Sequence, residues 1–207
     1  MKKNVSKIVS LVLAVAMCFC MCVTAFAAED NTISTAGGSG TTPVNLSTTK
    51  NGQIGGDPAA TAMSVTVPTA LPMAMAQDGS VTTATNCKII NNSFGAVRVK
   101  TVTIAGANGW TLTTFGDKST LASAKVDSDK LGFALTLGGG AQVKTDNSNT
   151  ASQTLISAPV TGCYMTGVGN QTGNSISVIY DAIVTPLSSA VTNATIANVV
   201  FIVEWDA

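Results

Sequence analysis

The chain has 207 residues with 11 basic and 11 acidic side chains, so it carries no net charge at pH 7, and only 11% of its residues are charged. It therefore lacks the basic surplus that holds nucleic acids or anionic membranes. Histidine is absent, which removes the most common general base and zinc ligand and the usual serine triad. We expect no nucleic-acid partner, no cofactor, no metal and no catalytic residues.

Residues 1–27 have the pattern of a secretion signal. Lys2, Lys3 and Lys7 form a positive start, an apolar run follows, and the sequence AFA at 25–27 fits a small-residue cleavage site. The apolar run is shorter than the ~20 residues of a membrane span; a retained anchor and a lipidated signal cysteine are the alternatives. We expect an exported bacterial protein with no membrane span after cleavage and a mature net charge of −3.

Residues 28–61 are poor in apolar side chains and rich in Thr, Ser and Gly, as in STAGGSGTTP. Such a composition buries too little surface to offset the entropy of ordering, so it predicts a flexible leader, part of which could add an edge strand. The rest of the chain, 62–207, is expected to form a single domain.

From Ala62 onward apolar and polar residues alternate, which is the period of a β-strand. The segment 62–68 predicts a strand, and 71–86 predicts a hairpin that turns at Asp78-Gly79, a pair that readily accepts positive φ. The segment 87–93 follows as a further strand.

In the long run 95–106, strict alternation places Val97 and Val99 on one face and Val102 and Ile104 on the other. We therefore expect a strand whose outer face becomes covered partway along.

Further strands are predicted at 109–115, 131–140, 153–160 and 175–187, with one or two helical turns within 117–131. The segment 198–207, NVVFIVEWDA, predicts a central strand because both of its faces are apolar as far as Glu204. Nine to eleven short strands with turn residues between them indicate an all-β fold, an antiparallel β-sandwich.

Two cysteines, Cys87 and Cys163, remain after signal removal. In an oxidising compartment they predict one disulfide. Two unpaired buried thiols are the alternative.

The carboxylates suggest two further hypotheses. Asp127 and Asp129 have a spacing that could hold calcium, but flanking lysines favour a solvated loop. Glu204 lies among apolar residues and could be a buried acid that promotes an amide crosslink between an asparagine and Lys88 or Lys100. The simpler interpretation is that the strand emerges into water at Glu204.

The motif Trp110-Thr111-Leu112, followed much later by Trp205-Asp206-Ala207, resembles the paired Trp-x-Leu pattern of the WxL surface proteins of Gram-positive bacteria. The second motif departs from the pattern, because Ala207 stands in the place of leucine. This resemblance implies a β-sandwich that associates non-covalently with peptidoglycan through Trp110, Leu112 and Trp205.

More broadly, the stretch SVTVPTALPMAMAQDGSVTTATNCKIINNSFGAVRV, together with GWTL and VVFIVEWD, is similar to small secreted surface proteins of clostridia. The likeness spans most of 62–207. Some proteins of this kind bind host immunoglobulin as B-cell superantigens, so the resemblance implies that immunoglobulin is a candidate partner.

We therefore expect a non-catalytic secreted or cell-surface binding protein, an adhesin that engages a host protein (immunoglobulin or another glycoprotein) or a glycan, including that of the cell wall. Polar loops on a rigid sheet are the usual place for recognition, and an exposed edge strand can pair with a partner's sheet. The alternative is a self-assembling subunit of a surface fibre or matrix, with the leader as a donated strand. The candidate loops are 105–109, 115–130, 145–152 and 166–174.

Overall fold

The computed structural model describes residues 49–50, 53–54, 62–117 and 119–207. The expected signal and most of the expected leader lie outside them. Within the leader, β1 (Thr49–Lys50) and β2 (Gln53–Ile54) pair antiparallel. The chain divides into two units, 1–58 and 59–207, and the second unit contains all the other described elements.

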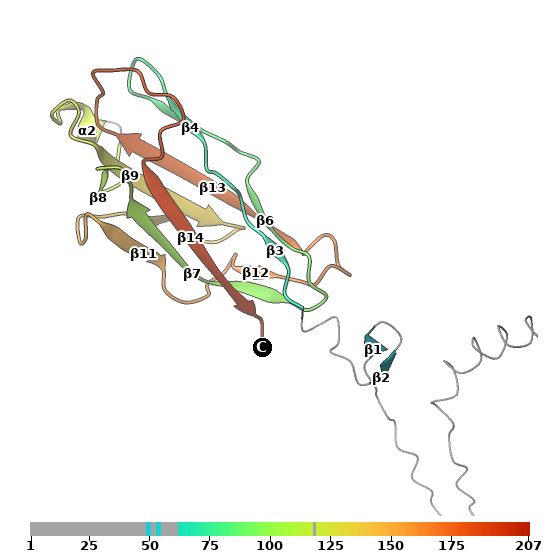
Figure 1. The fold of residues 1–207 in the computed structure, drawn as a ribbon. Coiled ribbons are helices and arrows are strands. Elements are labelled where there is room, and N and C mark those ends of the chain that lie inside the picture. The colour runs from blue at the N-terminus through green and yellow to red at the C-terminus, as the bar shows by residue number, and fades with distance from the viewer. Residues whose placement is uncertain (1–48, 51–52, 55–61, 118) are drawn as a thin grey trace, which may run out of the picture. The chain divides into compact units, whose positions relative to one another are not determined.

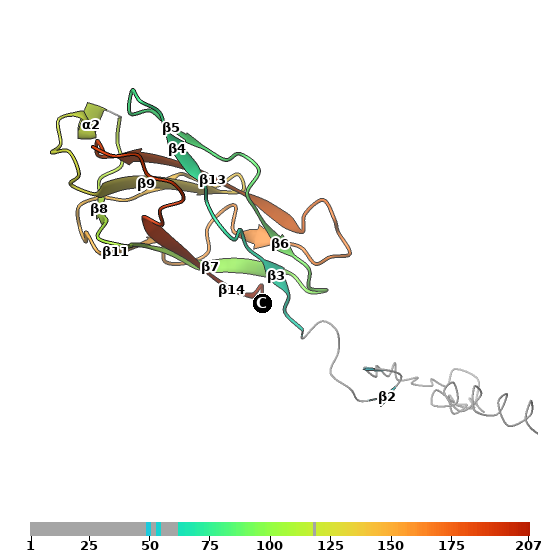
Figure 2. The same cartoon turned by 45° about the horizontal axis from the view of Figure 1, so that its top comes forward.

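The second unit is built from two sheets, which Figures 1 and 2 show from two directions. One sheet has the order β10 (Val143–Lys144), β9 (Lys130–Leu137), β13 (Ser175–Val184), β6 (Lys88–Asn91) and β3 (Val65–Thr66), with β8 (Thr111–Thr113) parallel to β9. The other has β7 (Val97–Gly106) at its centre, β11 (Ser152–Ile156) and β12 (Tyr164–Met165) along one side, and β14 (Ala197–Trp205) along the other. The hairpin β4 (Met73–Met75) and β5 (Val81–Thr83) and the short helix α2 (Ser119–Ala122) complete the unit.

A single hydrophobic core lies between the two sheets. Both sheets contribute fully buried side chains to one continuous cluster, among them Ile89, Leu135 and Val178 from the first sheet and Val97, Val102 and Ile104 from the second. The expected all-β sandwich is thus confirmed, with twelve strands from β3 to β14 in the described residues.

The expected alternation of β7 is wrong in its second half. Val97, Val99, Val102 and Ile104 all face the core and are at most 1% exposed. Their common direction results from a bulge, because the pairing with β14 shifts between Ile202 and Val203 and skips one residue of β7. One extra residue in a strand reverses the faces of everything that follows it.

The expected central position of the C-terminal strand is also wrong. β14 pairs with β7 along its whole length, and in the described residues no strand pairs with its other side. The opposite side of β7 is already taken by β11 and β12. β14 is therefore a nine-residue edge strand.

The hairpin expected at 71–86 is confirmed, with Gly79 at φ 77° in its turn. Tyr180 of β13 fastens it to the sandwich: the Tyr180 hydroxyl donates to the carbonyl of Pro72 and accepts from the amide of Ala84 at 3.2 Å. The Tyr180 ring stacks on Phe133, with centroids 6.0 Å apart.

The expected disulfide is wrong, since Cys87 and Cys163 are both free thiols. Their backbones belong to opposite sheets: the Cys87 carbonyl accepts from Val178 of β13, and the Cys163 carbonyl accepts from Val99 of β7. In this arrangement the two thiols do not bond to each other. Cys163 is buried in the core and Cys87 packs against it.

Candidate binding surfaces

Within the part of the chain that the structure describes, no strand pairs with the outer edge of β14. Ala107 donates its amide to the carbonyl of Ile196, and Asp206 donates its amide to the carbonyl of Ala96, so even-numbered positions of this segment bond to the β7 side. Bonding direction alternates along an antiparallel strand. The amides and carbonyls of Val199, Phe201 and Val203 consequently point to the free edge.

Two aliphatic side chains stand on the outer face of this edge strand. Val200 is 52% exposed and Ile202 is 49% exposed. Proteins commonly protect a long edge strand with charges, proline or a covering segment. The stretch from Ala197 to Val203 contains neither a charged residue nor a proline, so this edge has little of that protection.

The inner face of β14 is incompletely covered. Val199, Phe201, Val203 and Trp205 point toward the core but remain only partly buried. The corresponding inward residues of β7 are fully buried. The inner face of β14 therefore keeps some exposed apolar surface, which a further strand beside β14 could cover.

A cluster of four charges occupies the C-terminal end of the β14 face. The Arg98 Nε lies 2.9 Å from Oε1 of Glu204, the Lys100 Nζ lies 2.8 Å from its Oε2, and Arg98 also contacts Asp206 at 3.2 Å. The hydrogen bond from Lys100, followed by that from Arg98, lowers the pKa of Glu204, and the bond to Glu204 raises the pKa of Arg98. The Glu204 side chain is 28% exposed and partnered, so it is an ion-paired surface residue. With two cations and two anions the cluster is electrically balanced.

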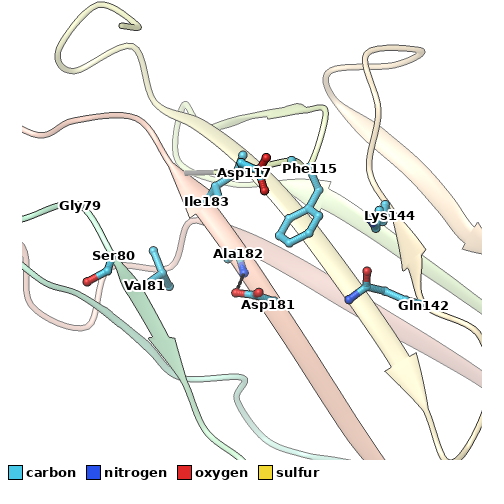
Figure 3. Close-up of a pocket in the computed structure, with 11 residues that line it drawn as sticks. Gly79, Ser80, Val81, Phe115, Asp117, Gln142, Lys144, Asp181, Ala182 and Ile183 are labelled. Atoms are coloured by element: carbon cyan, nitrogen blue, oxygen red, sulfur yellow. Dashed lines mark hydrogen bonds between the residues drawn. The ribbon is translucent and has the colours of Figure 1, made fainter. Parts of the chain in front are cut away.

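A second feature is a hollow of about 560 Å³ on the outer face of the first sheet. Figure 3 shows the Phe115 ring between Asp117 and Gln142, with Lys144 on its far side and Asp181 of β13 below it. The residues Gly79 to Val81 of the β4–β5 hairpin form the opposite wall. The Lys144 Nζ lies 5.4 Å from the centre of the Phe115 ring.

The position of Phe115 depends on small residues beneath it. A Cβ atom added to Gly132 of β9 would lie 3.0 Å from the Cα of Phe115 and 2.9 Å from the carbonyl oxygen of Thr114. The Phe115 amide donates to the carbonyl of Thr145, and the buried Thr145 hydroxyl donates to the carbonyl of Thr113. Sequence reasoning named the loop 115–130, whose first three residues line this hollow, but it did not find the other walls or the hollow itself.

In three of the four polar loops expected to carry recognition, side chains form internal hydrogen bonds. In the first loop the Asn108 side chain donates to the carbonyl of Thr195. In the third, Gln153 bonds to the backbone of Asp146 and Asn149. In the fourth, Asn170 accepts from the hydroxyls of Thr166 and Thr172. These groups stabilise loop shape and are less available to a ligand.

The carboxylate Asp127 is also occupied. It accepts hydrogen bonds from the amide and the hydroxyl of Ser188, and these bonds lower its pKa. Within the described residues no group of three or more His, Cys, Asp or Glu side chains could hold a metal ion. No helix in the same residues is long and apolar enough to cross a membrane.

The two tryptophans of the WxL-like motifs lie at opposite ends of the β7–β14 pair. The backbone of Trp110 packs against Gly106, which is paired with Ala197, whereas Trp205 is paired with Val97. Eight residue steps of ~3.3 Å separate Ala197 from Trp205, or roughly 26 Å. Leu112 is buried in the core. The structure therefore does not bring these three side chains together.

Comparison with known proteins finds no matching family model, no matching curated protein and no matching solved structure.

Proposed function

We propose that this protein is a non-catalytic, exported binding module that recognises a protein partner by adding an extended segment of that partner to the free edge of β14. The observation that supports this most directly is the unpaired edge itself, which runs beside the exposed Val200 and Ile202. In strand addition, main-chain hydrogen bonds supply affinity and alternate side chains supply specificity.

The chemistry of the edge defines the kind of segment that fits. Its middle is uncharged and aliphatic, and the cluster of Arg98, Lys100, Glu204 and Asp206 at one end is balanced. A partner segment with alternating β-branched and uncharged polar residues would place apolar side chains next to Val200 and Ile202. A strongly charged segment would lose hydration there without gaining an opposite charge.

Immunoglobulin is the first partner to test, because some surface proteins of the kind that this sequence resembles bind it. Immunoglobulin domains are β-sandwiches with edge strands of their own, so edge-to-edge pairing with β14 is geometrically available. Export to the bacterial surface, which the N-terminal pattern predicts, would place the module where such a partner is present.

The test uses two lysine substitutions on β14, Val200→Lys and Ile202→Lys, in the mature chain 28–207. A matched control exists in Ile179→Lys, because Ile179 is 53% exposed on the outer face of the other sheet. Binding to polyclonal mammalian immunoglobulin is measured by biolayer interferometry. We expect at least a roughly tenfold loss of affinity for each β14 variant and no change for the control. Equal affinity of all four proteins would exclude β14 as the binding edge.

A second function, that of a subunit in a surface fibre, is favoured by the incompletely covered inner face of β14. Val199, Phe201 and Val203 are only partly buried, and a strand donated by another copy would cover them. The leader 28–61 is the candidate donor. Light scattering of the chains 28–207 and 62–207 separates the two functions, because only a fibre subunit would form polymers that depend on the leader.

A further inference from the structure

We propose that the hollow around Phe115 is a second binding site, separate from β14, that takes an uncharged sugar residue of a glycan. The hollow belongs to the first sheet, and β14 belongs to the second. A ligand could therefore occupy this site while a partner strand occupies the edge.

The size of the hollow is compatible with a small ligand. Its volume of about 560 Å³ falls within the ~300–1,000 Å³ that small-molecule sites usually have. Its shape is formed by backbone contacts, since Gly132 allows close approach of the Thr114–Phe115 segment and the Phe115 amide is bonded to Thr145. These contacts hold the wall that carries Phe115 in place before a ligand arrives, which reduces the entropy lost on binding.

The lining combines an apolar ring with both kinds of hydrogen-bonding group. The partly exposed Phe115 offers aromatic surface, one side of which the Lys144 ammonium group covers, and the mostly buried Ile183 adds a little aliphatic surface beside it. Around them stand two acceptors, Asp117 and Asp181, one cationic donor, Lys144, and the amide of Gln142, which both donates and accepts. Sugars present the same combination, because an apolar C–H face is surrounded by hydroxyls that donate and accept.

The charges around the hollow disfavour an anionic ligand, because the two carboxylates Asp117 and Asp181 outnumber the single ammonium group of Lys144. A cationic ligand would meet the repulsion of Lys144, whose ammonium group already lies over the Phe115 ring. A purely apolar ligand would leave the polar rim without water and without partners. An uncharged polyhydroxy ligand avoids both costs.

The proposal can be tested by NMR on the isotopically labelled mature chain 28–207. The probes are the methyl glycosides of glucose, galactose, mannose and N-acetylglucosamine, with N-acetylneuraminic acid as the charged comparison. A single sugar in an open site is expected to bind with a dissociation constant on the order of 1 mM. At least one neutral sugar should shift the amide signals of 79–81, 115–117, 142–144 and 181–183.

The variant Gln142→Ala/Lys144→Ala should weaken that binding about tenfold. Lys88→Ala is the matched control, because Lys88 is also an exposed lysine on a strand of the first sheet, and it should leave the affinity unchanged. Absence of shifts with every neutral sugar, shifts that map elsewhere, or tighter binding of the anionic sugar would each overturn the proposal. Val200→Lys should not affect sugar binding, so this site and the β14 edge succeed or fail independently.

Discussion

The hydroxyl of Tyr180 gives the most direct test of how the β4–β5 hairpin is held to the sandwich. The substitution Tyr180→Phe removes the hydrogen bond to Pro72 and the one from Ala84, and it keeps the ring that stacks on Phe133. The perturbation therefore isolates the polar contacts from the packing.

The expected loss of stability depends on which hydrogen bonds Pro72 and Ala84 keep in the variant. The Ala84 amide also bonds to the Pro72 carbonyl at 3.3 Å, so neither group is left wholly without a partner. A net hydrogen bond contributes ~0.5–1.5 kcal/mol, and an unsatisfied buried group costs ~1–3 kcal/mol. We expect the free energy of unfolding to fall by about 1.5 kcal/mol, which for a domain of this size lowers Tm by roughly 3–6 °C.

The assay is urea denaturation followed by tryptophan fluorescence, with hydrogen exchange to locate the effect. Exchange should accelerate mainly in the hairpin, residues 72–84. Tyr164→Phe is the matched control, because Tyr164 is 47% exposed and no hydrogen bond of its hydroxyl is seen in the described residues; its effect should stay within ~0.5 kcal/mol. If the two variants were equally stable and hydrogen exchange in the hairpin were unchanged, the Tyr180 hydroxyl would not stabilise the contact between the hairpin and the sandwich.

Four further outcomes are expected. Burial raises the pKa of Tyr180 above its usual value near 10, so the Tyr180 hydroxyl loses its proton at a lower pH in the unfolded chain than in the folded one. The free energy of unfolding should therefore fall as pH rises past 10. Urea titration at each pH should show a steeper fall for the native sequence than for Tyr180→Phe. Glu204 has a lowered pKa, so its ion pairs should stabilise the fold above pH 4.5, the usual pKa of the unfolded side chain, and this stabilisation should disappear as pH falls. Glu204→Gln should lower the urea midpoint slightly at pH 7 and not at pH 2. An equal effect at both pH values would contradict the ion pairing. Gly106→Ala should destabilise by more than ~2 kcal/mol because its Cβ would lie 2.1 Å from the Trp110 carbonyl oxygen, whereas Gly139→Ala, with open space around it, should be nearly neutral in the same denaturation experiment. When the protein is unfolded and alkylated without reductant, mass spectrometry should find the label on both Cys87 and Cys163. If neither cysteine were labelled, the two would be joined by a disulfide after all.

Much of the architecture could be read from local patterns. Period-two alternation and β-branched residues predicted most of the strands, and Asp78-Gly79 predicted the hairpin turn that the structure shows. These features depend on backbone preferences and side-chain direction within a few residues, which the sequence records directly.

The candidate sites were less predictable because they depend on neighbours distant in the chain. The run from Val199 to Val203 reads as buried on both faces, yet Val200 and Ile202 are half exposed because they stand on the outer face of the second sheet, at its edge, and no third layer covers that face in the described residues. The hollow depends on Gly132 admitting Phe115, a contact between residues of two different segments. No local pattern specifies such a neighbour.

The amino-acid sequence by itself determined that this protein folds from short β-strands around an apolar core, because alternation sets which side chains can share a face. The tertiary structure alone decided that the bulge in β7 returns Val102 and Ile104 to the core, that β14 ends the sheet, and that Cys87 and Cys163 stay apart. These outcomes depend on strand order and register, which are fixed by hydrogen bonds between segments far apart in the chain.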